Sequence, residues 1–496
     1  MAHARAERAQ AVSGGSKMAE APVFGLLLRM SLPLMLSMMI QALYNIVDSV
    51  FIGMLPERAE ALQALGYAYP IQMLLVAGGV GTGIGVNALL SRSLGEKDGK
   101  KAAAAAGNGY FLMLCFYFAF LVFGFFVLFR GAYFDLCTQN ARIRELGQTY
   151  LGICLVFSFG QFILLIAERQ LCAVGRTGLA MTMQLAGALT NIALDPLFIF
   201  AFDMGAAGAA VATVLGQCVS MALGIFLNLR FNAEIRMTKK DLRPDAKVIG
   251  EIFRIGLPAI VLQCLQSLTT LIMQLVFGFL WEGDVKDLLV GIYGIFYKLQ
   301  YFVLMLGYGL TNASLSLLAY NFGKRDRERV KKTILSTLAI AAVVAVAGTL
   351  LFELLPAQLL SLFNASSAPA AGGISELSVG VTVMRVTALS FPFALLNIML
   401  ASALQGLGSG VRSMIVALLR LLVVLMPACF LFGKSGGIDA LWWGALVAEA
   451  AALVYASFAT LAVYRRTMRE SSAAPDSPAG TDAGTTPGTE GAHDPF

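Results

Sequence analysis

The stretch "SLPLMLSMMIQALYNIVDSVFIG", residues 31–53, is an apolar run long enough to cross a bilayer. It returns 225 residues later as "GLPAIVLQCLQSLTTLIMQLVFG", residues 256–278, with Leu-Pro, Gln and Gly in the same places. The preceding Arg29 likewise meets Arg254. One apolar helix that recurs with its polar and helix-breaking residues suggests an internal duplication.

The duplication continues through the rest of both halves. After a three-residue insertion the offset becomes 228, and near the end of each half it is 233 and then 232. Ordered matches over six helices are the mark of a tandem transporter repeat, and an even helix count gives both copies the same orientation. The further matched pairs are Gly66 and Gly294, Gly79 and Gly307, Gly81 and Gly309, Gly95 and Gly323, Asp98 and Asp326, Gly175 and Gly408, and Gly205 and Gly437.

The composition indicates an integral membrane protein. Of its 496 residues, 58% are hydrophobic and 13% are charged, against about 25% charged in a soluble domain. We therefore predict an all-α polytopic protein with twelve transmembrane helices in two pseudo-symmetric six-helix bundles. The predicted segments are a cytoplasmic N-terminal segment (1–23), the N-terminal bundle (24–230), a cytoplasmic linker (231–250), the C-terminal bundle (251–466) and a disordered cytoplasmic tail (467–496).

Charge sets the predicted topology. Lys and Arg gather in short segments that all fall on one side of the predicted spans. The positive-inside rule places this side, and with it both termini, in the cytoplasm. The net charge of +6 thus reflects topology, and nucleic-acid binding is not expected. The N-terminal residues show no signal-peptide cleavage pattern. The basic segments begin at residues 95, 228, 323 and 464.

Several kinds of enzyme or cofactor site are not expected. The seven cysteines lack CxxC spacing, so neither a disulfide framework nor a structural metal site is predicted. His3 and His493 lie in the terminal segments, away from the membrane domain. The glycine-rich "GGVGTGIG", residues 78–85, is not followed by the Lys and Ser/Thr of a phosphate-binding loop, and close helix packing explains it better.

Ionisable side chains inside predicted spans are functional candidates, because they are costly in hydrocarbon. Asp48 and Asp195 fall at similar depths near the outer ends of two spans. Tyr44 and Asn191 each precede one of these acids by a helical turn, and Thr213 returns to the same depth. These five oxygen-bearing side chains predict a cation or proton site in the N-terminal bundle. The alternative is that they only hydrogen-bond within the bundle to fix its packing.

Proline adds to this layer. Pro196 cannot donate a backbone hydrogen bond, so the carbonyl of Ile192 is predicted to be free for a cation. Two close carboxylates in a low dielectric cannot both ionise freely unless a cation enters, and competition between proton, metal ion and cationic substrate is a basis for antiport. Pro33 and Pro258 are predicted to bend the first helix of each half.

The second half does not repeat the acids. Met273 takes the place of Asp48. Glu449 is expected to pair with Arg420 or Arg385, or else these residues line or gate the substrate pathway. Further candidates for the central cavity are Lys298, Gln300 and the repeated glutamines Gln41 and Gln266.

Six fragments of the sequence form a recognisable combination, at residues 31–53, 87–98, 172–178, 191–200, 205–217 and 404–410. Together they resemble the multidrug and toxic compound extrusion (MATE) family, and the resemblance extends over about residues 24–466. The resemblance implies two six-helix bundles that form a V, and export of organic, often cationic compounds in exchange for Na⁺ or H⁺. It also assigns ion coupling to Asp48, Asn191, Asp195 and Thr213, with Tyr44 beside them. Acids that other members carry in the C-terminal bundle are replaced here by Gln263, Gln266 and Arg385.

We therefore expect a monomeric multi-pass antiporter of the bacterial plasma membrane, not an enzyme. It would have no cofactor besides the coupling Na⁺ or H⁺, and its partners would be small organic molecules and membrane lipid. One alternative is a flippase for lipid-linked sugars, in which Arg385, Arg420 and Lys298 bind phosphate. An intramembrane enzyme or a passive channel fits the sequence less well.

Overall fold

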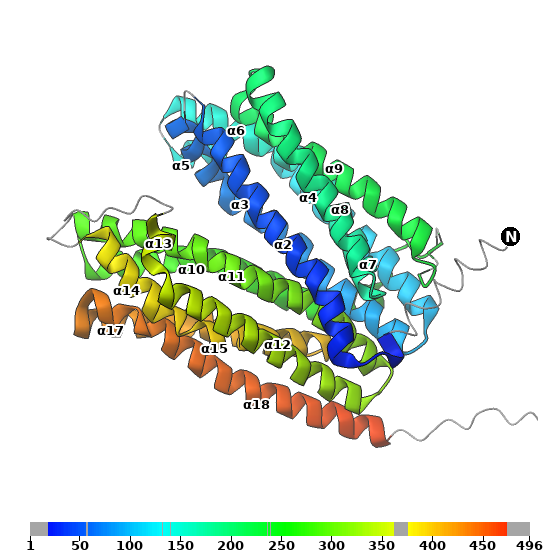
Figure 1. Cartoon of the computed structure of the whole chain (residues 1–496). Helices are drawn as coiled ribbons and strands as arrows, with labels where there is room; N and C mark the ends of the chain where they lie inside the picture. Colours follow the sequence, from blue (N-terminus) through cyan, green and yellow to red (C-terminus); the bar gives the residue numbers. More distant parts are fainter. Residues whose placement is uncertain are drawn as a thin grey trace, which may run out of the picture.

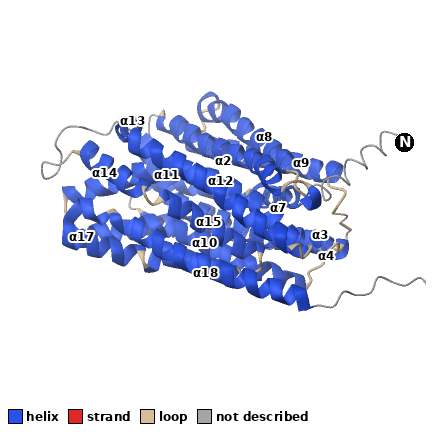
Figure 2. Cartoon of the chain, turned by 60° about the horizontal axis from the view of Figure 1, so that its bottom comes forward, coloured by secondary structure: helices blue, strands red, loops and turns tan. Residues whose placement is uncertain are grey.

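The computed structural model describes residues 18–55, 58–130, 132–138, 140–235, 237–238, 240–361 and 375–473. Nearly all of these residues are helical, as Figure 2 shows, and the predicted all-α fold class is confirmed. His3 and His493 lie outside the described residues. The first half contains α2 (Val23–Gly53), α3 (Arg58–Gly95), α4 (Gly99–Arg130), α5 (Ala132–Cys137), α6 (Ala141–Val156), α7 (Phe159–Ala173), α8 (Thr177–Pro196), the π-helical segment η1 (Leu197–Ala201) and α9 (Gly205–Phe231).

The second half follows the same order. It contains α10 (Ala246–Leu280), α11 (Asp284–Gly323), α12 (Arg327–Leu354), α13 (Pro356–Ser361), α14 (Glu376–Ala388), α15 (Phe391–Gly406), α16 (Gly410–Leu418), the π-helical segment η3 (Leu419–Val423), α17 (Leu425–Leu441) and α18 (Trp443–Ala473). Two boundaries differ from the predicted segments. α10 already begins inside the predicted linker, and α18 runs through residues 467–473 of the predicted tail.

Twelve spans result when two bent helix pairs are each counted as one. Among the described residues, ten helices are long and apolar enough to cross a membrane, and the pairs α6–α7 and α14–α15 supply two more. Each pair bends by 46°. Ser158 and Ser390 stand at the breaks, and each hydroxyl donates to a carbonyl of the preceding turn, over 2.8 and 2.6 Å. The apolar pattern hid both breaks, because they do not interrupt the hydrophobic runs.

The internal repeat is visible in the backbone. Lys97 and Arg325, 228 residues apart, both have φ of 60°. A positive φ is uncommon for residues other than glycine. The matched pairs Gly175 with Gly408 and Gly205 with Gly437 also have positive φ. Equivalent turns thus have the same unusual conformation in both halves. The capping aspartates repeat as well, because Asp98 accepts from the first turn of α4 and Asp326 from that of α12.

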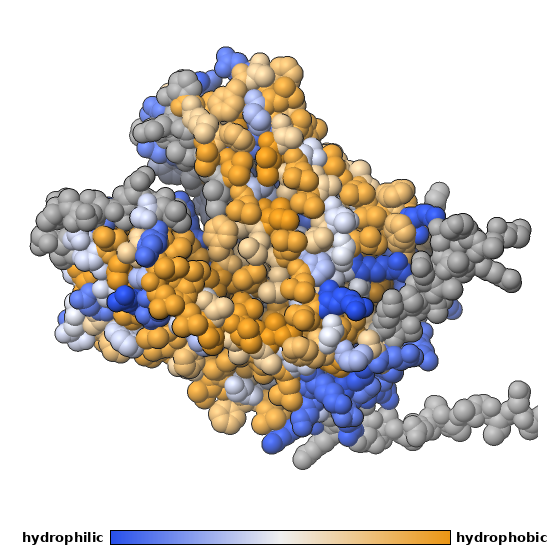
Figure 3. Space-filling view, viewed as in Figure 1, coloured by the Kyte–Doolittle hydropathy of each residue, from blue (hydrophilic) through white to orange (hydrophobic). Residues whose placement is uncertain are grey.

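The two bundles diverge from one end of the molecule, as Figure 1 shows. We call that end the basic end: it holds the start of α2, the end of α18 and the loops around Lys97, Arg243 and Arg325. Here α3 packs against α10 and α11, and α2 packs against α11. At the opposite, open end a notch separates the bundles (Figure 3). The arrangement is the predicted V.

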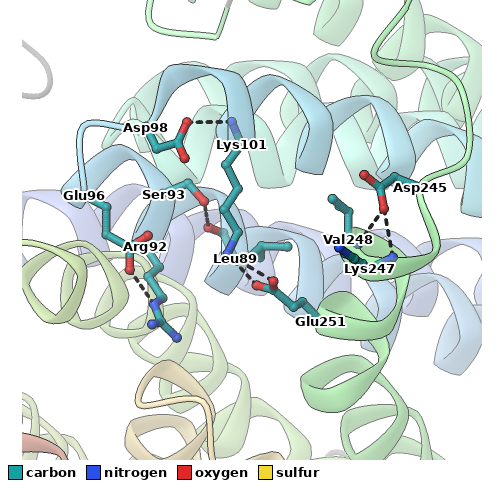
Figure 4. A network of polar contacts seen from close by, with 10 residues as sticks. All are labelled: Leu89, Arg92, Ser93, Glu96, Asp98, Lys101, Asp245, Lys247, Val248 and Glu251. Carbon is teal, nitrogen blue, oxygen red and sulfur yellow. Dashed lines mark hydrogen bonds and ion pairs between the residues drawn. The ribbon is translucent and has the colours of Figure 1, made fainter. Parts of the chain in front are cut away.

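Polar contacts join the bundles at the basic end (Figure 4). Lys101 of α4 forms an ion pair of 2.7 Å with Glu251 of α10. Asp245 caps α10 by accepting from two backbone N–H groups of its first turn. The α10 start is thereby held against the N-terminal bundle. Around the middle of the molecule the surface is apolar, as expected for contact with lipid, with large exposed side chains such as Phe118, Val343 and Phe458.

Candidate functional site

The acid of α8 lies in a buried polar layer of the N-terminal bundle. Asp195 is fully buried and Asn191 is 3% exposed. The side-chain N–H₂ of Asn191 lies 3.2 Å from Asp195 Oδ1 and 3.4 Å from the hydroxyl oxygen of Thr213 on α9. The predicted spacing of one turn between Asn191 and Asp195 is therefore realised, and Thr213 joins them from the next helix.

The acid of α2 completes the layer, because α2 packs directly against α8. Asp48 is within electrostatic reach of Asp195 and of Tyr44. Tyr44 shares a hydrogen bond with Gln41, one turn earlier on α2. Oδ1 of Asp48, Oδ1 of Asn191 and Oδ2 of Asp195 are buried without a hydrogen-bond partner among the described residues. Buried acceptors without donors are costly, and a proton or a cation would satisfy them.

The backbone of α8 changes its helical pitch directly after Asp195. Pro196 ends α8, and η1 follows, with Phe202 N–H donating to the carbonyl of Leu197 over 3.0 Å. π-helical turns inside α-helices are frequent at functional sites. Cation binding by the Ile192 carbonyl stays a prediction. Pro33 and Pro258 lie inside α2 and α10.

A central cavity lies between the two bundles and holds about 1550 Å³, including the part open to solvent. Neither Asp48 nor Asp195 lines it. The predicted residues that line the cavity come from both halves of the chain. One of them, Gln266, also donates a hydrogen bond to the hydroxyl of Tyr308. The layer around the acids is thus set just behind the cavity wall and shares residues with it. The predicted residues that line the cavity are Gln41, Tyr44, Asn191, Thr213, Gln266 and Arg420.

The C-terminal bundle holds a buried charge pair formed by Arg420 and Glu449. Nη2 of Arg420 lies 2.6 Å from Oε1 of Glu449, and the two side chains are 10% and 12% exposed. The side-chain N–H₂ of Asn397 donates to Oε2 of Glu449 over 2.8 Å. The pairing of Glu449 with Arg420 is confirmed. Both line a second cavity of about 920 Å³, together with Met273 and Gln300.

Two cationic residues that were candidates for the substrate pathway, Arg385 and Lys298, line neither cavity. The Arg385 side chain is 57% exposed and lies 4.0 Å from Glu353, so its alternative pairing with Glu449 is wrong. Lys298 is exposed and lines neither of the two cavities. Its role in the substrate pathway stays a prediction.

The sequence analysis does not identify four polar residues that lie near the site. Glu168 and Arg169 are buried and line the central cavity. The apolar run in the sequence predicts a span over about residues 144–168, whereas α7 continues to Ala173 after the break at Ser158. Alignment of Gly175 with Gly408 could have found them, because it places them opposite buried residues 401 and 402 of α15. The other two residues are Gln72 and Tyr150, which are hydrogen-bonded over 3.4 Å near Asp48.

The described residues contain no cluster of three or more His, Cys, Asp or Glu side chains that could hold a metal ion. The described cysteines are free thiols. The layer around Asp48 and Asp195 offers two carboxylates with hydroxyl and amide oxygens. Hard oxygen donors of this kind suit Na⁺, while either carboxylate can accept a proton.

Comparison with known proteins gives consistent results. The MatE family model matches residues 33–197 and 258–431. Multidrug export protein MepA of Staphylococcus aureus is 26% identical over 435 residues, which cover 87% of this chain and 92% of the relative. MepA of Staphylococcus saprophyticus is 28% identical over 430 residues, or 86% of this chain and 91% of the relative.

Solved structures share the fold. An outward-facing multidrug resistance MATE family transporter of the MOP superfamily has a TM-score of 0.83 at 21% identity, covering 92% of this chain and 99% of that one. A MOP superfamily transporter from Pyrococcus furiosus, described as having a binding pocket of reverse polarity, has a TM-score of 0.83 at 21% identity, covering 91% and 98%. With its duplicated bundles, its central cavity and the family match to both halves, the chain belongs to the MATE family of multi-pass membrane transporters.

Proposed function

We propose that the protein is a secondary antiporter that exports amphiphilic, cationic organic compounds in exchange for H⁺ or Na⁺. The observation that carries this proposal is the set of buried oxygen atoms without partners on Asp48, Asn191 and Asp195. The similarity to MepA, named as a multidrug export protein, supports export of more than one compound.

The polar layer and the cavity share residues, and this supports coupling between ion and substrate. Asn191 bonds to Asp195 on one side and lines the cavity on the other. A proton or Na⁺ at the carboxylates draws Asn191 and Thr213 toward itself and changes the cavity wall. Entry of the ion from the open end then lowers the affinity for bound compound, and release of the ion restores it.

The proposed topology places the basic end, with both termini, in the cytoplasm of a bacterial cell. The V then opens to the outside, and the state described is outward-open. We propose a monomer without resident cofactor or enzymatic step, in contact with membrane lipid.

The rival flippase needs free cations for a phosphate group. Arg420 is engaged with Glu449, the Arg385 side chain lies 4.0 Å from Glu353, and Lys298 lines neither of the two cavities. These contacts favour the antiporter.

The proposal is tested with purified protein in liposomes loaded with ethidium. An imposed Na⁺ gradient and, separately, a pH gradient are applied, and dye movement is followed by fluorescence. Uphill movement driven by one gradient is expected and identifies the coupling ion. Movement that only follows the dye gradient, with either ion, would refute antiport.

A further inference from the structure

A third acid of the N-terminal bundle stands apart from the layer around Asp48 and Asp195. Glu168 on α7 is 1% exposed and lines the central cavity. Its Oε1 has no hydrogen-bond partner, and no described cationic side chain forms an ion pair with it. A buried carboxylate needs a cation or donors to remain charged. Among the described residues, no donor reaches Oε1 and no ion pair with this carboxylate is formed.

The adjacent Arg169 forms no ion pair with Glu168 among the described residues, and the hydrogen bond from its Nη1 goes elsewhere. Neighbouring residues of a helix point about 100° apart, so they do not face each other. Arg169 extends over Gly83 of α3, where a Cβ atom would lie 3.1 Å from Arg169 Cγ. Its Nη1 then donates to Oδ1 of Asn312 across the bundle interface, over 2.7 Å. Nη1 of the guanidinium is therefore bonded to α11, while Nε has no hydrogen-bond partner among the described residues.

The rest of the cavity wall is mostly neutral. Among the described residues that line the cavity, Glu168 is the one carboxylate, and the two cations are Arg169 and Arg420. Arg420 is bound to Glu449, which does not line this cavity. Most of the polar wall consists of amides, including Gln161, Gln184, Gln217, Gln263 and Gln405.

Apolar and aromatic side chains also line the central cavity near Glu168. Leu164 and Leu165 share the cavity-facing side of α7 with Glu168, while Tyr301 and Tyr308 line the cavity from α11. This combination suits a molecule with one positive charge and several rings, because aromatic faces also attract cations. We propose that Glu168 is the residue that selects cations in the central cavity, where its carboxylate meets the positive charge of an amphiphilic ligand. This inference rests on the proposed function, whose coupling acids it does not include.

The test compares two probes of nearly the same shape and opposite charge, tetraphenylphosphonium and tetraphenylborate. Their binding to purified full-length protein in nanodiscs is measured at equilibrium for the natural protein and for Glu168→Gln. The variant is expected to bind the phosphonium about tenfold more weakly, since a buried charge pair is lost, and to bind the borate at least as tightly as the natural protein does, since a repelling carboxylate is removed. Unchanged phosphonium affinity in Glu168→Gln would overturn the proposal.

Two further variants separate charge from shape. Glu168→Asp keeps the charge and should retain most of the phosphonium affinity. Gln161→Glu in the Glu168→Gln background returns a carboxylate to the same face of α7, two turns away, and should restore part of it. Borate binding reports on folding in every variant, so loss of both probes together would count against a role in selectivity.

The outcomes for Glu168 and for antiport are distinguishable. If ethidium export is gradient-driven but phosphonium affinity does not depend on Glu168, this inference fails and the antiport stands. If phosphonium binding depends on Glu168 but no gradient drives export, the antiport fails and cation selection by Glu168 stands.

Discussion

Gly95 and Gly323 occupy equivalent positions in the two repeats, and each presses against the backbone of the other bundle. A Cβ atom on Gly95 would overlap the carbonyl oxygen of Tyr320, and one on Gly323 would overlap that of Arg92. Gly81 and Gly309 repeat this relationship deeper in the molecule, against Ile260 and Met35 of the opposite bundle. The closed basic end is therefore a two-fold symmetric contact that requires glycine.

Alanine at this contact should force the bundles apart. Gly95→Ala or Gly323→Ala places a methyl group against rigid backbone, and overpacking of this kind costs about 1–3 kcal/mol. We expect a lower melting temperature in detergent and a shift toward the state that is open at the basic end, read by cysteine accessibility there. Gly99→Ala is the control, because a Cβ atom there meets nothing within 4 Å. Equal behaviour of Gly95→Ala and Gly99→Ala would show that the contact is not tight.

The cross-bundle bond between Arg169 and Asn312 should stabilise the same closed contact. Hydrogen bonds to charged groups contribute about 1.5–3 kcal/mol. Arg169→Gln, Asn312→Ala and the double variant form a cycle, in which thermal unfolding should give a coupling energy of about 1 kcal/mol or more. The exposed pair Arg142 and Glu145, with side chains 47% and 65% exposed, should give a coupling near zero. Additive effects of Arg169→Gln and Asn312→Ala would contradict the bond.

The stability of the protein should depend on the buried pair of Arg420 and Glu449 and should fall when one partner is removed. Glu449→Gln leaves the guanidinium buried without its counter-charge, at a cost of about 3–5 kcal/mol. Removing both charges with Arg420→Met and Glu449→Met together should recover much of the stability. Arg385→Met, at an exposed side chain, should change the melting temperature little. A Glu449→Gln protein that melts like the natural one would contradict a structural role for the pair.

The link between ion layer and cavity passes through Asn191. Asn191→Leu removes the amide that contacts both Asp195 and Thr213, and it preserves approximate volume. We expect substrate binding in the absence of the coupling ion to persist, while the ion no longer lowers substrate affinity. Thr182→Val is a matched control on α8, because its hydroxyl only returns to the carbonyl of Leu179. If added ion still displaces substrate from Asn191→Leu, coupling takes another route.

Much of the candidate site could be predicted from sequence because depth and helical period are local properties. The layer of Asp48, Asn191, Asp195 and Thr213 needed only span boundaries and the one-turn spacing of side chains. The pairing of Glu449 required a choice between Arg420 and Arg385, which depends on how α14 packs against α18. Hydrophobic periodicity predicts helices, but it does not predict how two helices pack against each other.

Glu168 shows a different limit. Because of the break at Ser158, α6 and α7 together are longer than the predicted span. Glu168, which the sequence places at the edge of the membrane, therefore lies buried inside the protein. Averaged hydropathy hides such a break. Alignment of the two repeats is not affected by it, because it compares single positions.

The central claim is that cation binding at Asp48 and Asp195 drives export. It is tested most directly by gradient-driven ethidium transport in liposomes containing Asp48→Asn, with Asp203→Asn, an exposed aspartate, as the matched control. We predict that Asp48→Asn loses transport against the dye gradient while Asp203→Asn retains it. Undiminished uphill transport by Asp48→Asn, at normal protein levels in the membrane, would contradict the account.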